Sequence, residues 1–246
     1  VQVFQMNTAQ LQKTLRASQY AEQILNLHQN TLEQDAAVHP FDQSLSTEKI
    51  QLLIQQSLVG LQDEAQWMQA LRVLRARLMF RWIWQDANQQ TDVVTLTREL
   101  SDFADACIVA AKEFALIPLL AKHGEPIGYS GKVQDLIVIA MGKLGAQELN
   151  LSSDIDLIFA FDEQGETNGR KCIDVQQFCI LWGQKLIYLL DHITADGFVF
   201  RVDMRLRPWG DGSALVISHV ALEKYLSQHG REWERYAWIK ARIITG

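Results

Sequence analysis

The sequence predicts an α+β fold, in which a helical N-terminal region precedes a core of mixed sheet and helices. Of the 14 glycines, only Gly60 and Gly124 come before residue 126, so the residues that punctuate turns and strand ends gather in the second half. The first half shows apolar residues at helical spacing, whereas the second contains a glycine-bounded apolar run and an alternating stretch. We therefore expect a helical region over residues 1–125 and a sheet-containing core over residues 126–246.

Composition excludes several classes of protein. With 48% hydrophobic residues, 21% charged residues and a formal net charge of −6, the 246 residues are typical of a globular chain. No apolar run reaches the roughly 18 residues of a membrane span, and no secretory signal opens the chain. Three unclustered cysteines argue against disulfides and a zinc site, and the acidic balance argues against nucleic acid as a partner. We expect a reduced, cytoplasmic protein without a membrane partner.

Helices are predicted where apolar residues recur every three to five positions. Ser46 is expected to begin one of them, because serine is a good N-cap. The predicted helices cover residues 8–28, a segment from Ser46 onward, residues 63–88 and residues 92–122.

The helix over residues 63–88 carries four arginines close to its apolar stripe, at positions 72, 75, 77 and 81. Two interpretations stay open for this cluster. The arginines face a phosphate-bearing ligand, or they form a solvated helix face paired with acidic neighbours, which is the favoured interpretation. Trp82 and Trp84 are expected to pack in the core.

Strands are predicted in the second half. Residues 133–141 (VQDLIVIAM) form an almost unbroken apolar run, as expected of a buried central strand. Residues 152–159 (SSDIDLIF) read as the next strand, and residues 198–206 alternate apolar and polar side chains along a third. A helix is expected between the last two, from Asp174 as N-cap to Asp191.

The two later strands bring three carboxylates together. Asp154 and Asp156 lie on one strand face, since side chains alternate, and Asp203 lies on the polar face of the third strand. Such carboxylates repel each other unless a cation neutralises them, and Mg²⁺ prefers their oxygens. Three carboxylates on adjacent strands predict a two-metal site for displacement at phosphorus, with Gly142 and Lys143 positioned to hold phosphate oxygens. The alternatives are exposed edge-strand aspartates, or an ion network of Asp203 with neighbouring arginines.

Other motifs are weaker. Residues 128–132 (GYSGK) only superficially resemble a P-loop, because the first glycine and the Ser/Thr after the lysine are missing and the segment precedes its strand. Cys172, Cys179 and His192 lack the spacing of zinc ligands. The six histidines show no nucleophile–base arrangement.

Longer strings resemble a known family: VIAMGKLGAQELNLSSDIDLIF, RVDMRLRPWG and REWERYAWIKAR. They are similar to the glutamine synthetase adenylyltransferase/adenylyl-removing enzymes, which belong to the polymerase β-like nucleotidyltransferases. Members carry two similar domains in one long chain. One attaches AMP to a tyrosine of glutamine synthetase, and the other removes it. The resemblance covers about residues 133–242 and implies that residues 126–246 are a nucleotidyltransferase core cut from a longer chain, which the start at Val1 also suggests.

The resemblance also implies roles for individual residues. The expected catalytic, metal-binding carboxylates are Asp154, Asp156 and Asp203. The expected nucleotide- and phosphate-binding residues are Gly142, Lys143, Ser153, Arg205, Arg207, Lys240 and Arg242. A solvated helix-end role is the alternative for Lys240 and Arg242. Ala146 departs from the family, which often has a second glycine there.

The strings RVDMRLRP and WERYAWIKAR resemble the N-terminal, adenylyl-removing domain of the family. The implied reaction is phosphorolytic removal of AMP from a tyrosine of glutamine synthetase, with two Mg²⁺ as cofactors and release of ADP. ATP-dependent adenylylation in the forward direction is one alternative, and a non-catalytic, effector-sensing regulatory domain is the other. The implied substrates and products are phosphate and ADP or ATP, and the implied partners are glutamine synthetase and a PII-type signalling protein.

Overall fold

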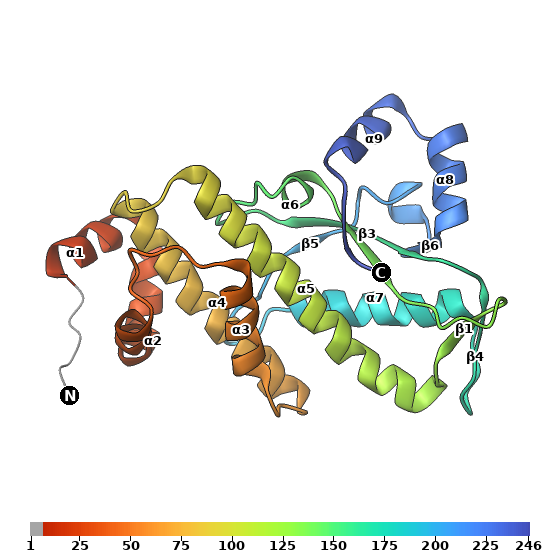
Figure 1. Cartoon of the computed structure of the whole chain (residues 1–246), viewed down its shortest axis with the longest axis horizontal. Coiled ribbons are helices and arrows are strands. Elements are labelled where there is room, and N and C mark those ends of the chain that lie inside the picture. Colours follow the sequence, from red (N-terminus) through yellow and green to blue (C-terminus); the bar gives the residue numbers. More distant parts are fainter. Residues whose placement is uncertain (1–6) are drawn as a thin grey trace. The chain divides into compact units, whose positions relative to one another are not determined.

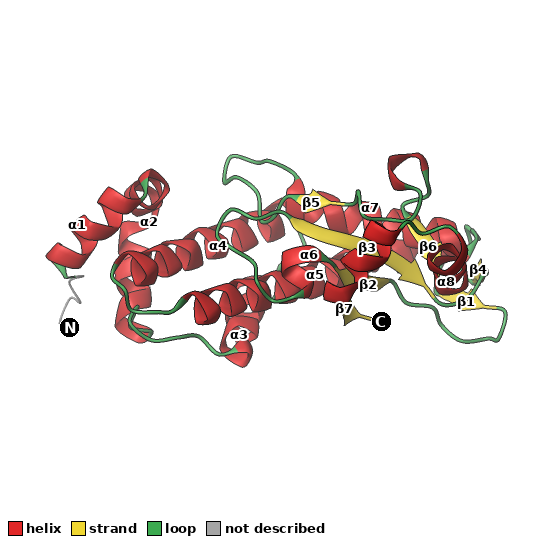
Figure 2. Ribbon diagram, turned by 90° about the horizontal axis from the view of Figure 1, so that it is seen from above, coloured by secondary structure: helices red, strands yellow, loops and turns green. Residues whose placement is uncertain are grey.

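The computed structural model describes residues 7–246 and confirms the α+β fold. The chain forms two compact units, whose boundary between Phe103 and Ala104 falls within helix α5 (Figure 1). In the described part of the chain, the first unit is helical and the second holds the strands (Figure 2). No helix in residues 7–246 combines the length and apolar character needed to cross a membrane.

Five helices are described up to residue 123: α1 (Thr8–Ala17), α2 (Gln19–Val38), α3 (Thr47–Leu58), α4 (Glu64–Ala87) and α5 (Val93–His123). The prediction of a single helix over residues 8–28 is wrong, because the chain breaks at Ser18. This residue is extended, and its hydroxyl oxygen accepts a hydrogen bond from the N–H of Ala21 at 3.2 Å, which begins a new helix. The predicted cap at Ser46 is confirmed, with the N–H of Lys49 as its donor.

The arginines of α4 differ from the favoured interpretation. Arg72 and Arg81 are buried rather than solvated, with exposed fractions of 1% and 3%. The Arg81 guanidinium donates to backbone carbonyl oxygens of the segment 39–43. Arg77 follows the expectation of an acidic neighbour, since it pairs with Asp35. Backbone carbonyl oxygens therefore accept the hydrogen bonds of the guanidinium that α4 buries at Arg81.

Trp82 and Trp84 lie in the core of the first unit, as predicted. The indole N–H of Trp82 donates to the Glu99 carboxylate at 2.8 Å, and the backbone N–H of Leu45 donates to the other oxygen at 2.9 Å. Burial raises the pKa of Glu99 despite these bonds. A buried polar group thus links α4, α5 and the segment before α3.

The second unit is built on a mixed sheet with the strand order β5-β3-β2-β7, in which β6 also pairs with β3. Its strands are β2 (Ile137–Ala140), β3 (Ile155–Phe161), β5 (Val202–Asp203), β6 (Val216–Ser218) and β7 (Arg242–Thr245). Strand β2 runs antiparallel to both neighbours, whereas β5 and β6 pair with β3 in parallel. A separate antiparallel pair joins β1 (Pro126–Gly128) to β4 (Gly165–Thr167).

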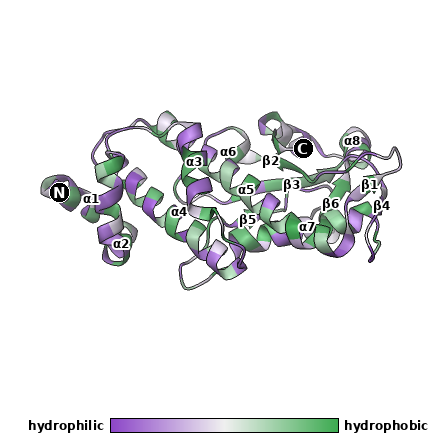
Figure 3. Cartoon of the chain, turned by 60° about the horizontal axis from the view of Figure 1, so that its bottom comes forward, coloured by the Kyte–Doolittle hydropathy of each residue, from purple (hydrophilic) through white to green (hydrophobic). Residues whose placement is uncertain are grey.

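Helices lie on both faces of this sheet, whose central strands are hydrophobic (Figures 1 and 3). On one face, Gly183 of α7 (Val175–Asp191) packs so closely on Phe159 that a Cβ atom would lie 2.7 Å from its ring. On the other face, Leu222 of α8 (His219–Gln228) packs with Ile139 and Ile158. The helix α9 (Glu232–Ala237) and the 3₁₀ turn η2 (Trp238–Lys240) continue this layer. The predicted N-cap Asp174 of α7 is confirmed.

The second unit contains less strand than predicted. The strand expected over residues 133–141 begins only at Ile137. The strand expected over residues 198–206 is wrong except for Val202–Asp203, because Val199 and Phe200 are both buried and the alternation fails. Beyond it, the Asp203 carboxylate accepts the N–H of Arg205 at 2.8 Å, and the chain turns toward the 3₁₀ turn η1 (Gly210–Gly212).

Candidate functional site

A polar pocket of about 460 Å³ lies in the second unit, where β3 and β5 meet the short helix α6 (Gly142–Gly145). Residues from three segments of the chain line it. Its lining residues are Gly142, Lys143, Asn150, Ser152, Ser153, Asp154, Asp156, Arg201, Asp203 and Arg205. The three carboxylates that the sequence singles out therefore share one pocket.

The pairing of β3 with β5 brings these carboxylates together. The two strands are parallel, and their register places Asp156 directly beside Asp203. Asp154 comes two residues before Asp156, and the same pocket includes its side chain. Adjacent residues on paired strands point to the same face of a sheet, so segments far apart in sequence deliver their carboxylates to one place.

The carboxylates differ in their electrostatic surroundings. Burial, followed by the charges of Asp203 and Asp154, raises the pKa of Asp156. The pKa of Asp203 is lowered instead, chiefly because the Arg205 side chain donates hydrogen bonds to it. Asp154 pairs with Arg201, whose Nε lies 2.5 Å from its Oδ1. Asp156 is thus the carboxylate with the least compensated negative charge.

Helix α6 requires glycine at both of its ends. Gly142 has a φ of +54°, and a Cβ atom there would lie 2.6 Å from Oδ2 of Asp156. A Cβ atom at Gly145 would lie 1.9 Å from the backbone oxygen of Lys240. The close approach of α6 to both β3 and η2 therefore depends on these two glycines.

Lys143 lies at the rim of the pocket beside a small hydroxyl–amide cluster. Its Nζ lies 3.4 Å from Oγ of Ser153, which donates to Oδ1 of Asn150 at 2.8 Å. The N–H of Ser152 also donates to Oδ1 of Asn150. The Asn150 side chain therefore shapes the turn that carries Ser153 and Asp154 into the pocket.

The structure brings seven of the ten expected site residues to the pocket. The other three, Arg207, Lys240 and Arg242, do not line it. Lys240 pairs with Glu148 at 2.6 Å, and Arg242 pairs with Asp105 at 2.7 Å.

Three residues that line the pocket were not predicted from the sequence as site residues: Asn150, Ser152 and Arg201. Asn150 and Ser152 lie four and two residues before the D-x-D pair in the sequence, which was the available signal. Arg201 was placed beside Asp203 on a strand that the structure shortens to two residues. Its partner is Asp154, from a segment 47 residues away.

Three carboxylates line one pocket, and carboxylate oxygens are the type of ligand that Mg²⁺ prefers. In residues 7–246, no three His, Cys, Asp or Glu side chains converge closely enough to share one ion. Two of the three pocket carboxylates are instead held by the guanidinium groups of Arg201 and Arg205.

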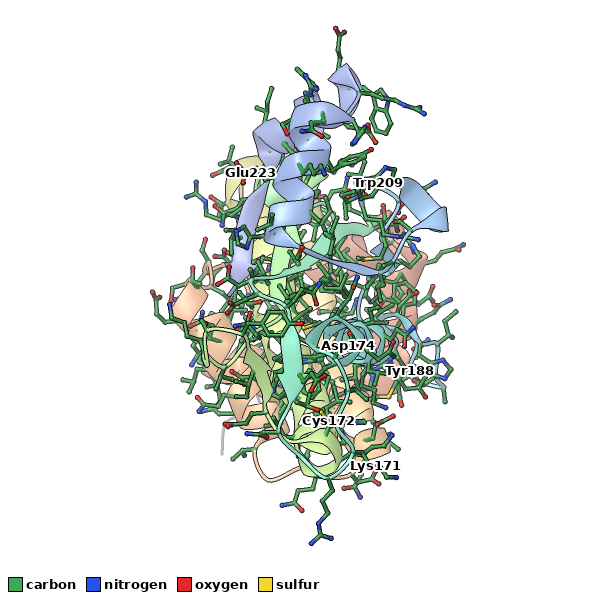
Figure 4. The ribbon with its side chains drawn as sticks, turned by 90° about the vertical axis from the view of Figure 1, so that its right-hand side faces the viewer. Lys171, Cys172, Asp174, Tyr188, Trp209 and Glu223 are labelled. Atoms are coloured by element: carbon green, nitrogen blue, oxygen red, sulfur yellow. The ribbon has the colours of Figure 1, made fainter. Side chains whose placement is uncertain are left out.

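The remaining motifs lie outside this pocket. In the segment GYSGK, the backbone N–H and the hydroxyl of Ser130 donate to the Glu163 carboxylate, at 3.0 and 2.6 Å. This loop therefore binds a carboxylate of its own chain. Cys172 is exposed beside Lys171 in the segment before α7 (Figure 4).

Known proteins are similar to this chain over nearly its whole length. A family model described as glutamate-ammonia ligase adenylyltransferase matches residues 8–246. A bifunctional glutamine synthetase adenylyltransferase/adenylyl-removing enzyme from Acinetobacter baylyi is 79% identical over 243 residues, which cover 99% of this chain and 26% of that protein. Proteins of the same name from Thioalkalivibrio sulfidiphilus and Hahella chejuensis are 52% and 50% identical over 75% and 78% of this chain, and 19% and 20% of their own length.

The chain thus spans about a quarter or less of the length of these relatives. The matched region includes the α6 segment, the D-x-D pair and Asp203. The chain belongs to the glutamate-ammonia ligase adenylyltransferase family.

Proposed function

We propose that this chain removes AMP from an adenylylated tyrosine of glutamine synthetase by phosphorolysis and releases ADP. Family membership supports an adenylyl-modifying reaction. The observation that carries the proposal is the register that sets Asp156 beside Asp203, in a pocket that also contains Asp154, Gly142 and Lys143. The resemblance of its motifs to the adenylyl-removing domain favours this direction of reaction.

The proposed reaction is a displacement at the α-phosphorus. An oxygen of inorganic phosphate forms a bond to this phosphorus as the bond to the tyrosyl oxygen breaks. The tyrosyl oxygen takes a proton, and the phosphate and AMP leave together as ADP. Positioning and charge neutralisation supply most of the catalysis in such transfers, so no protein nucleophile is required.

Asp154, Asp156 and Asp203 would hold Mg²⁺, as one or two ions, in this proposal. The bound cation would neutralise charge on the phosphoryl oxygens. Asp156 would gain the most from a cation, because burial and the neighbouring carboxylates already raise its pKa. The ammonium of Lys143 would contact a phosphate group at the pocket rim, and Gly142 would let the backbone approach it.

The test is phosphate- and Mg²⁺-dependent release of ADP from adenylylated glutamine synthetase. Asp154→Asn should abolish this release while the circular dichroism spectrum stays unchanged, since the Asp154 side chain is 46% exposed. Asp196→Asn is the matched control, because Asp196 is exposed and outside the pocket, and should keep full activity. Retained release by Asp154→Asn contradicts the proposed site.

A second candidate is the forward reaction, transfer of AMP from ATP to the same tyrosine. The name of the relatives covers both directions, and one pocket would bind the same phosphoryl group in either. Incubation with unmodified glutamine synthetase and labelled ATP separates the two.

We also propose that a PII-type signalling protein regulates the chain and that the chain is located in the cytoplasm.

A further inference from the structure

We propose that Arg201 is a positioning residue that competes with a divalent cation for Asp154, and that an incoming phosphate group draws it away. The inference rests on the proposed function and concerns how the same pocket is loaded. It assigns Arg201 two alternative partners, the carboxylate of Asp154 and a phosphate group.

Arg201 holds the segment that carries Asp154. Its Nε lies 2.5 Å from Oδ1 of Asp154, and its Nη2 donates to the backbone oxygen of Ser152 at 2.7 Å. The guanidinium carbon lies 5.4 Å from the centre of the Phe198 ring, which supports it from one side. One side chain therefore fixes both the backbone and the carboxylate of a proposed metal-binding segment.

The pair is exposed enough to exchange partners. The side chains of Arg201 and Asp154 are 51% and 46% exposed. Ion pairs in such surroundings are weak, because water and salt compete for both groups. Either a cation at Asp154 or an anion at Arg201 can therefore replace the other partner.

The second pair in the pocket is held more firmly. The Asp203 side chain is only 13% exposed, and it accepts hydrogen bonds from both the backbone N–H and the guanidinium of Arg205. Asp203 is thus part of its own turn, whereas Asp154 depends on a residue from a distant segment. The Arg205 and Arg201 side chains are 77% and 51% exposed, so the two pairs differ in the burial of the carboxylate rather than in that of the guanidinium.

This arrangement couples the cation to the phosphate. A cation at Asp154 frees the Arg201 guanidinium, which is a bidentate donor for phosphate oxygens. A phosphate group on Arg201 frees Asp154 for the cation in return, and the coupling must be reciprocal. Because an exposed ion pair is weak, the pairing of Arg201 with Asp154 should lower the cation affinity by only about two- to five-fold.

The test is Mn²⁺ binding, measured by electron paramagnetic resonance on the full 246-residue chain with and without inorganic phosphate. Without phosphate, Arg201→Gln should bind Mn²⁺ about two- to five-fold more tightly than the unmodified chain. Phosphate should increase Mn²⁺ affinity less in Arg201→Gln than in the unmodified chain. Arg170→Gln, which removes an exposed arginine outside the pocket, should match the unmodified chain.

The outcomes separate the inference from the proposed function. Equal or weaker Mn²⁺ binding by Arg201→Gln, with normal binding by the unmodified chain, overturns the inference and leaves the metal site standing. Absence of Mn²⁺ binding in every variant overturns both. Arg201→Lys keeps the positive charge and should bind Mn²⁺ with nearly the affinity of the unmodified chain. If its Mn²⁺ affinity is as high as that of Arg201→Gln, the inference that Arg201 competes with the cation is overturned. Circular dichroism verifies the fold of each variant.

Discussion

Replacing Gly145 by alanine tests how closely α6 must approach its neighbours. A Cβ atom at this position would lie 1.9 Å from the backbone oxygen of Lys240 and 2.7 Å from that of Ala140. Both contacts are to backbone, so no side-chain rotation relieves them. Contacts of a Cβ atom below 3.0 Å essentially do not occur, and α6 or η2 must therefore move.

The size of the effect follows from overpacking. Forcing a methyl group into a packed site costs about 1–3 kcal/mol. In a chain of this length each kcal/mol lowers the melting temperature by about 2–4 °C, so Gly145→Ala should lower it by about 2–12 °C. A displacement of α6 also moves Gly142 and Lys143, which belong to the same short helix, so the KM for phosphate should rise.

Thermal unfolding followed by circular dichroism measures the first effect, and initial rates over a range of phosphate concentrations measure the second. Gly212→Ala is the matched control, because a Cβ atom there meets nothing within 4 Å, and it should leave both unchanged. A surface substitution usually changes the melting temperature by only about 1 °C. A melting temperature for Gly145→Ala that lies within about 1 °C of the control would therefore refute the account of α6.

Three further predictions concern charge. Because the pKa of Asp156 is raised in the folded chain, ionising it costs stability as pH rises from the ordinary value of about 3.9. Asp156→Asn should therefore raise the melting temperature at pH 7, and the gain should vanish near pH 4; a gain that persists there argues against this cause. Arg81→Leu leaves carbonyl oxygens of the segment 39–43 without their donor and should lower the free energy of unfolding by about 1–3 kcal/mol in urea titrations. An unchanged urea midpoint would show that water replaces the guanidinium. Mg²⁺ should raise the melting temperature of the unmodified chain but not of Asp154→Asn, and equal shifts would place the ion elsewhere.

Much of the helical structure was predictable because its signals are local. Asp63, Ser46 and Asp174 each accept the N–H three residues later, and each begins the expected helix. Ser18 carries the same signal, but the apolar spacing across residues 8–28 obscured it. A capping residue inside a periodic stretch therefore deserved more weight than the periodicity.

The strand over residues 198–206 could not be predicted because alternation alone does not establish a strand. Val199 and Phe200 are both buried by packing, and Asp203 binds the backbone of its own turn. The burial of Arg72 and Arg81 likewise depends on tertiary contacts that the helix pattern does not contain.

The grouping of the three aspartates was accessible from the sequence, since adjacent strands were expected to share a polar face. The pairing of Asp154 with Arg201 was not, because it joins segments 47 residues apart. It also depends on where β5 begins, at Val202, which the alternating pattern did not reveal. Long-range partners of charged residues are decided by strand pairing rather than by local spacing.

The central claim is that inorganic phosphate attacks the α-phosphorus of AMP bound to tyrosine. The most direct measurement incubates adenylylated glutamine synthetase with the chain, Mg²⁺ and ³²P-labelled phosphate, and separates the nucleotides. The account predicts labelled ADP, with the label in the β-phosphate, and none with Asp154→Asn. Release of unlabelled AMP, or no nucleotide release by the unmodified chain, would contradict it.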